Sequence, residues 1–541
     1  MTYLVAIAIG PVQEFIAAAR RCRDLWYGSQ LLSEISKAAA LELKQRGANL
    51  IFPAPEDGDL EEWSDFTVVN KLLASVETPD VEGLLREVRR AARARLKREG
   101  NLKEMKLRGM TVNEDLYQRQ LGGILEFYSA WTPLTDDYHA SRKCVELLLA
   151  ARKTLRDFPA YQGEAGKYKS SLDGARESVI EKRSDRLYSS HLKANEYLDA
   201  IGIVKRFGEG NQRFDSTVDV AAVPFVKSCE NGSDKRKAVF RRYKRFVLDQ
   251  GLLPETYSLL YEHESRQLFD DDEEADRELK DFRAALGKPN PPYYALLHGD
   301  GDHMGRAIGE LKSPEEHQKF SRELSRFAGD ARKKIDKEYG GCSIYCGGDD
   351  VLALLPLHTA LRCAQAVNEL FRDSLKDYAV TFSAGLVVAH GLEPLNEVRN
   401  WAVEAEHTAK AAGGRDALCI SVNPRSGAPI SLYGKWDELT GPAGLLLKMV
   451  ELYGRDTKAM PRGLGYELRD LVERLEGWDG IDSVLPNLVL AVAKKKECAE
   501  DALQLIETHA RDRSSVERVY QSMMVARWFA RAEREAKGDA A

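Results

Sequence analysis

Two short acidic segments of this chain contain the residue types that bind divalent cations. Gly347-Gly348-Asp349-Asp350 lies between two apolar runs rich in strand formers, which is typical of a β-hairpin with carboxylates at its tip. Adjacent carboxylates repel each other unless a cation lies between them. A lone tetrapeptide of this kind is more often an acidic turn in solvent, so its interpretation depends on what accompanies it.

The second segment, Gly299-Asp300-Gly301-Asp302, ends an apolar run. In an extended strand residues i and i+2 face the same side, so Asp300 and Asp302 are predicted to converge on one cation. A hairpin beside this strand end would supply the other carboxylates. The predicted metal ligands are Asp300, Gly301, Asp302, Asp349 and Asp350.

Hard oxygen ligands of this kind suit Mg²⁺ or Mn²⁺ bound together with substrate phosphates. A two-metal site would activate a 3′-hydroxyl and neutralise an α-phosphate. We therefore predict a nucleotidyl-transfer site in which Asp300, Asp349 and Asp350 are catalytic.

Other residues are candidates for nucleotide binding. Lys410 and Arg415 follow a predicted helix and can hold a triphosphate, although a basic helix end has the same composition. Ser383 lies on a predicted central strand, where contact with base or ribose and a small core residue are equally consistent. Gln13 and Asn70 are candidates for a second nucleotide pocket, but helix packing explains them nearly as well. The predicted nucleotide-binding residues are Gly347, Gly348, Ser383, Lys410, Arg415, Gln13 and Asn70.

The elements around the acidic segments are typical of a palm domain. Apolar patterns predict the order β-α-β-β-α-β-α-β, which is ferredoxin-like. Residues 3–9 form another strand that ends at a glycine before a helix, without carboxylates, which indicates a second and catalytically silent palm. A helix break is expected at Gly28-Ser29. The predicted α+β domains are a first palm at 1–130, a mostly helical insert at 131–290, a second palm at 291–435 and a C-terminal helical bundle at 436–541.

The composition is that of a soluble globular protein. The 541 residues are 43% hydrophobic and 30% charged, with a net charge of −6. Eight cysteines are scattered without a C-x-x-C pair, and no run of 18 apolar residues occurs, so we expect a reduced cytoplasmic protein without a membrane span. Two basic patches, at 86–108 and 235–245, can bind phosphate backbones. The second patch interleaves Phe240 and Tyr243 with seven basic residues, which favours RNA.

The pattern D-x-D, GGDD and A-K-x-x-G-R resembles the catalytic core shared by GGDEF-type diguanylate cyclases and the CRISPR polymerase-like proteins. Cyclases carry GGDEF or GGEEF, whereas this chain has Gly-Gly-Asp-Asp-Val. Further segments resemble the large polymerase-like subunit of type III-B (Cmr) CRISPR effector complexes, from residue 3 to about 440. These segments are 10–15, 20–33, 167–174, 204–206 and 299–305.

The resemblance implies two facing palms, with a helical insert and a C-terminal helical domain. It also implies an ATP-dependent synthase of cyclic oligoadenylate, which acts when the complex has captured target RNA with its guide RNA. The implied partners are both RNAs and the backbone, small and adjacent large-end subunits of the complex. Asp349 and Asp350 would be the metal-binding catalytic pair, and Asp300 the partner ligand.

Two departures from the family pattern change these expectations. Many members begin with an HD-type nuclease, whereas this sequence opens on the first palm and has no His-Asp dipeptide, so nuclease activity is not expected. Ser170-Ser171 stands where the family often has a cysteine of a zinc site, so zinc is not expected either.

Three alternatives remain open from the sequence. ATP can be joined to another acceptor such as S-adenosylmethionine, as in some nuclease-less relatives. The chain can also be a non-catalytic RNA-binding scaffold that retains its carboxylates. A free-standing diguanylate cyclase is disfavoured by GGDD and by the lack of a sensor domain.

Overall fold

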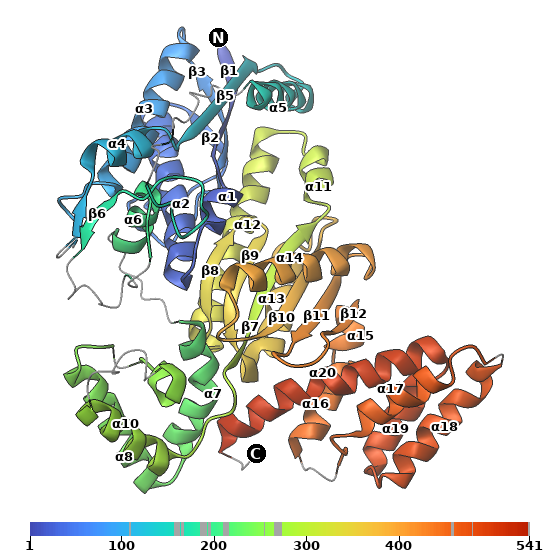
Figure 1. The fold of residues 1–541 in the computed structure, drawn as a ribbon. Helices are drawn as coiled ribbons and strands as arrows, with labels where there is room; N and C mark the ends of the chain where they lie inside the picture. Colours follow the sequence, from blue (N-terminus) through green and yellow to red (C-terminus); the bar gives the residue numbers. More distant parts are fainter. Residues whose placement is uncertain are drawn as a thin grey trace.

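Two β-sheets form the framework of the protein, and the four strands of the first correspond in order to β8-β9-β7-β10 of the second (Figure 1). The first has the order β2-β3-β1-β5, and the second has the order β12-β11-β10-β7-β9-β8. β1 is antiparallel to β3 and β5, just as β7 is antiparallel to β9 and β10. The repeated order confirms the prediction of two ferredoxin-like palms. This computed structural model describes residues 1–105, 107, 110–155, 163, 167–183, 192, 196–208, 216–253, 255–264, 273–455, 459–478 and 480–538.

The first palm is built on the central strand β1, which is buried from Leu4 onward. The helix α5 packs against β5 and β1, so this unit extends through α5, and a boundary at residue 130 would cut β5. The elements are β1 (Thr2–Gly10), α1 (Gln13–Ala17), α2 (Cys22–Gln45), β2 (Asn49–Phe52), β3 (Lys71–Glu77), α3 (Val81–Glu99), β4 (Met110–Val112), α4 (Glu114–Gly122), β5 (Glu126–Pro133) and α5 (Tyr138–Thr154).

The expected helix break at Gly28-Ser29 is wrong, because α2 runs without interruption from Cys22 to Gln45. A Cβ atom on Gly28 would lie 2.9 Å from Cε of Lys205. This glycine therefore allows the close approach of a lysine from the insert.

The second palm surrounds β7, with β9 on one side and β10 on the other. Its elements are β7 (Tyr293–Asp302), α11 (Met304–Glu310), α12 (Pro314–Lys333) with a π-helical turn η3 (Lys334–Glu338), β8 (Cys342–Gly347), β9 (Asp350–Pro356), α13 (Leu357–Ser374), β10 (Thr381–His390), α14 (Leu395–Ala411), β11 (Ala417–Asn423) and β12 (Ile430–Lys435). Its core continues into that of the C-terminal bundle. That bundle comprises α15 (Trp436–Leu439), α16 (Leu445–Arg455), α17 (Leu464–Arg474), α18 (Ile481–Lys495), α19 (Glu500–His509) and α20 (Arg513–Lys537).

The segment between the palms divides into two parts. β6 (Ile180–Arg183) pairs with β4, and α6 (Ala200–Phe207) packs into the core of the first palm. The helices α7 (Thr217–Asn231), α8 (Asp234–Asp249), η2 (Ser258–Leu260) and α10 (Glu273–Leu286) form a core of their own. Phe240 and Tyr243 of the basic helix α8 belong to this core and are 3% and 0% exposed. The expectation that they stack on RNA bases is therefore wrong.

The two palms pack reciprocally. The long helix α2 of the first palm lies against β8 of the second, and the long helix α12 of the second lies against β2 of the first. The backbone N–H of Ala54 donates to Oγ of Ser321 (3.0 Å), and Nε2 of Gln318 donates to the carbonyl of Leu50 (2.7 Å). This packing holds the GGDD hairpin against the first palm. Among the described residues, no helix is both long and apolar enough to cross a membrane.

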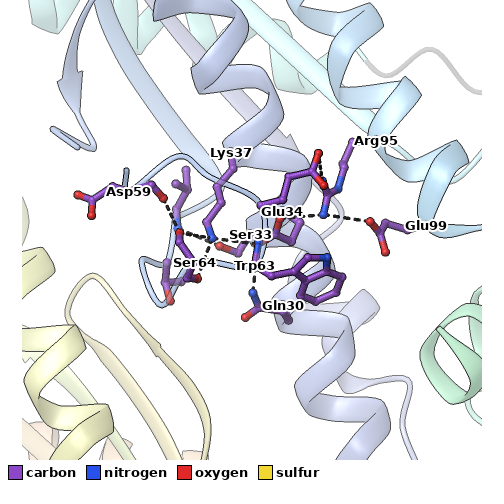
Figure 2. Close-up of polar contacts among 12 residues, drawn as sticks. Gln30, Ser33, Glu34, Lys37, Asp59, Trp63, Ser64, Arg95 and Glu99 are labelled. Atoms are coloured by element: carbon purple, nitrogen blue, oxygen red, sulfur yellow. Dashed lines mark hydrogen bonds and ion pairs between the residues drawn. The ribbon is translucent and has the colours of Figure 1, made fainter. Parts of the chain in front are cut away.

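A buried ionic network holds the connection between β2 and β3 (Figure 2). The carboxylate of Glu34 on α2 accepts from Nζ of Lys37 (2.9 Å) and from the guanidinium of Arg95 on α3 (2.9 Å). It also accepts the backbone N–H of Trp63 (3.2 Å), and Lys37 donates to the carbonyl of Ser64 (2.9 Å). These bonds tie the connecting loop, residues 53–70, to the long helix.

Replacing Arg95 should destabilise the first palm, because its side chain is 4% exposed and pairs with Glu34 and Glu99. Arg95→Met removes one of the two cations that pair with Glu34 and the cation that pairs with Glu99, and breaking a buried pair in this way costs about 3–5 kcal/mol. The urea midpoint, followed by tryptophan fluorescence, should fall accordingly. Arg93→Met removes an exposed arginine of the same helix and should leave the midpoint nearly unchanged; equal shifts would contradict the role of the network.

Candidate functional site

The end of β7 and the hairpin between β8 and β9 bring three carboxylates together. The register places Val351 opposite Gly299, so Asp350 begins its strand beside Asp300. Each of Asp300, Asp349 and Asp350 contributes a carboxylate oxygen, and these oxygens lie within 4.8 Å of one another. This spacing fits one divalent cation with hard oxygen ligands.

Two glycines allow this geometry. A Cβ on Gly301 would lie 2.8 Å from Cβ of Asp349, so only glycine lets the two segments approach this closely. Gly348 has a φ of +64°, which disfavours any other residue at the hairpin turn. A Cβ there would lie 3.5 Å from Val69 of the first palm. The turn is therefore fixed against the neighbouring domain.

The raised pKa values of two of these carboxyl groups indicate that nearby positive charge does not balance the cluster. Burial, and then the charge of Asp300, raises the pKa of Asp349 to about 7. Burial, a hydrogen bond to Asp300 and the charge of Asp349 raise the pKa of Asp350 well above its ordinary value. The nearest cation is the ammonium of Lys410, which contacts Asp300 and lies 2.7 Å from Glu406. A single lysine does not balance three carboxylates, and the residues present fit a bound Mg²⁺ or Mn²⁺.

Asp302 does not join the cluster. It is 1% exposed, and its Oδ2 accepts from the hydroxyls of Thr381 (2.8 Å) and Ser383 (2.8 Å) and from the backbone N–H of Asp416 (3.0 Å). We predicted that Asp300 and Asp302 converge on one cation. The donors on β10 and after α14 instead hold the Asp302 carboxylate apart from the cluster of Asp300, Asp349 and Asp350. Asp302 instead joins β7 to those two segments.

The predicted nucleotide-binding residues lie at different places around the cluster. The Ser383 side chain is fully buried and donates to Asp302, so it is not free to contact a base or ribose. Lys410 contacts the predicted catalytic Asp300 directly. The Arg415 guanidinium is half-exposed, with Nε 3.9 Å from Asp302, and remains available to a phosphate.

The candidates for a second nucleotide lie at the end of β1. Nδ2 of Asn70 donates to the carbonyl of Ile9 (3.3 Å), and the Ile9 N–H donates back to the Asn70 carbonyl (2.8 Å). Asn70 follows Val69, which faces the GGDD turn, so it lies near the boundary between the palms. Gln13 begins α1, and its side chain lies outside the described residues.

Sequence reasoning missed two residues of the site. Glu406 is buried and pairs with Lys410 one helical turn away, so the i,i+4 spacing was the available signal. Val69 supports the GGDD turn from another domain, and no local pattern in the sequence indicates that contact.

Comparison with known proteins finds similarity to one family in two segments of the chain. Residues 293–419 match the family model for the second palm domain of Cas10/Cmr2, and residues 4–98 match the N-terminal model of the CRISPR-associated protein Cmr2. A curated relative, the CRISPR system Cmr subunit Cmr2 of Pyrococcus furiosus, is 27% identical over 80% of this chain. The matched segments contain most of each palm, so both palms are similar to Cas10/Cmr2 domains. The predicted resemblance to type III-B large subunits is thus confirmed, and the chain spans 63% of the length of that relative.

Solved structures of type III-B Cmr-beta and of a Csm1–Csm4 cassette share the fold. A type III-B Cmr-beta structure bound to cognate target RNA matches with a TM-score of 0.63 at 13% identity, over 92% of this chain and 79% of that chain. The apo state of Cmr-beta matches with a TM-score of 0.62 at 12% identity, over 92% and 78%. A Csm1–Csm4 cassette in complex with cA4 matches with a TM-score of 0.52 at 15% identity, over 97% and 70%.

Gly301→Ala should weaken cation binding, because the new methyl group collides with Asp349. We expect the Mn²⁺ affinity to fall about 10–100-fold, the range for changes that misplace metal ligands. Isothermal titration calorimetry on the full chain measures this. Gly305→Ala adds the same methyl group where no atom lies within 4 Å and serves as the matched control. An unchanged Mn²⁺ affinity in Gly301→Ala would contradict a cation site at this position.

The raised carboxyl pKa values predict opposite effects of pH with and without a cation. With no cation bound, the free energy of unfolding falls as pH rises from about 4 through about 7. In this range unfolding releases a proton that Asp349 retains in the folded state. Mn²⁺ competes with this proton, so it should raise the unfolding temperature more at pH 8 than at pH 6. Differential scanning fluorimetry with EDTA or MnCl₂ measures both effects. In Asp349→Asn with Asp350→Asn the Mn²⁺ effect should disappear at either pH, and its persistence would argue against the site.

Proposed function

We propose that this chain is a nucleotidyltransferase that uses ATP and a divalent cation to make cyclic oligoadenylate when its complex binds target RNA. The observation that carries the proposal is the partly exposed cluster of Asp300, Asp349 and Asp350 at the contact between the palms. The Cas10/Cmr2 matches cover this cluster and the first palm that faces it. Structures similar to this chain, one bound to cognate target RNA and one in complex with cA4, support the partner and product classes.

Each residue of the site then has a role. The three aspartates hold the cation, which when bound supplies Lewis-acid activation of a 3′-hydroxyl and charge neutralisation at an α-phosphate. Lys410 balances the carboxylates, and the exposed fork of Arg415 binds the triphosphate. Asn70, beside the hairpin, faces the second nucleotide. A second metal ion and the Gly301 carbonyl as a ligand are parts of the same proposal.

The partners are proposed on the same grounds. A type III-B large subunit would contact guide RNA, target RNA and the other subunits of the complex. Exposed arginines of α3, such as Arg86 and Arg93, provide positive charge for a phosphate backbone.

Asp349→Ala with Asp350→Ala should abolish product formation while leaving RNA binding intact. The assembled complex is incubated with ATP and Mn²⁺, with and without target RNA, and products are identified by mass spectrometry. Glu273→Ala with Glu274→Ala removes two adjacent exposed carboxylates and should keep full activity. Product from the aspartate variant would disprove the site assignment.

Added arms of the same assay separate the alternatives. A conjugate that forms only when S-adenosylmethionine accompanies ATP would identify another acceptor. Turnover of GTP without RNA would indicate a cyclase. Absence of any product, together with no Mn²⁺ or ATP binding in calorimetry, would leave a scaffold that binds RNA.

A further inference from the structure

A cavity of about 370 Å³ in the C-terminal bundle carries an unusual concentration of positive charge. It lies between α16, α17 and α20, and four arginines line it. None of the described residues that line it is acidic. Its size falls at the small end of the range for ligand pockets, about 300–1,000 Å³. The four arginines are Arg462, Arg527, Arg531 and Arg534.

The arginines of α20 are spaced to repel one another. Arg527, Arg531 and Arg534 follow an i, i+4, i+7 pattern on one face of the helix, where like charges are destabilising. Arg531 donates to the Oδ1 amide oxygen of Asn290 (2.6 Å), which carries no charge. Within the described chain, Arg462 and Arg527 form no ion pair with a carboxylate. A bound anion would relieve this repulsion.

A buried hydroxyl provides an independent sign of a missing partner. Tyr453 lines the cavity and is 4% exposed, yet its hydroxyl has no hydrogen-bond partner among the described residues. Leaving a buried donor unpaired is costly, so such groups usually meet a ligand or water. Burial raises the pKa of Tyr453, so the group stays an O–H donor. It can donate to an anion held by the arginines.

Aromatic rings at the cavity indicate an anion that also carries a flat ring system. Tyr466 is 42% exposed, and its ring contacts the guanidinium groups of Arg469 (5.7 Å) and Arg527 (5.2 Å). Guanidinium forks match phosphate oxygens, and aromatic rings stack on nucleobases. We propose that this cavity binds a phosphorylated nucleoside, either free or as a unit of an RNA strand.

This cavity is separate from the carboxylate cluster. Trp528 at its wall contacts the ring of Tyr293, the first residue of β7 (4.6 Å). Asp300 lies seven residues further along the same strand, or about 23 Å at 3.3 Å per residue. The proposal therefore does not depend on the activity of the palm.

The test compares three full-length variants. Arg527→Gln with Arg531→Gln removes charge from the cavity, and Tyr453→Phe removes only the unpaired hydroxyl, which should not harm folding. Lys494→Gln with Lys495→Gln removes two exposed charges elsewhere in the bundle as the control. Fluorescence anisotropy with a labelled 12-nucleotide RNA measures strand binding, and thermal shifts with AMP or inorganic phosphate measure free ligands.

The expected result is a loss confined to the cavity variants. RNA affinity should fall about tenfold or more with each lost charged hydrogen bond if a strand occupies the cavity. If a free nucleotide occupies it, RNA binding stays unchanged and only the AMP-dependent thermal shift is lost. Equal behaviour of the cavity and control variants would overturn the proposal. Protection by inorganic phosphate equal to that by AMP would also overturn it, because the site would not recognise a nucleoside.

Discussion

The mutual repulsion of three carboxylates is the constraint on which this structure depends. Asp300 comes from the central strand and Asp349 and Asp350 from the adjacent hairpin, so the backbone register itself holds the charges together. The hairpin cannot turn away, because its glycine turn abuts Val69 and α2 packs on β8. Lys410 contacts Asp300 but also pairs with Glu406, so its charge does not neutralise the three aspartates. Asp349 and Asp350 therefore retain protons to a higher pH than ordinary aspartates, and a divalent cation would compete with those protons.

The two palms share one topology but differ in the connection between two equivalent strands. In the second palm β8 and β9 are joined by a tight glycine turn, whereas the equivalent strands of the first palm are joined by the loop 53–70. That loop pairs with the second palm through Glu56 and Arg326 (3.3 Å), and the network around Glu34 holds it in place. β1 ends in Ala8, Ile9 and Gly10, without carboxylates. The first palm therefore provides a rigid surface against which the GGDD hairpin packs.

Local patterns predicted most of this arrangement. Alternating apolar residues located β1 and β7, and the D-x-D and GGDD segments identified the carboxylates that the fold brings together. The errors came from contacts between distant segments. Gly28 resembles a helix break until Lys205 is placed beside it, and Phe240 and Tyr243 resemble a stacking surface until α10 covers them. No spacing rule within a single segment contains that information.

Asp302 is the clearest case of such a distant contact, and it explains why two aspartates two residues apart act differently. Its carboxylate accepts hydrogen bonds from β10 and from the backbone of Asp416, across more than 70 residues of sequence. Arg415 and Asp416 have φ angles of +59° and +45°, which non-glycine residues adopt at a cost. The buried Asp302 offsets that cost and keeps the turn beside Asp300. Asp300 thus joins the carboxylate cluster, while Asp302 fixes the turn that carries Arg415.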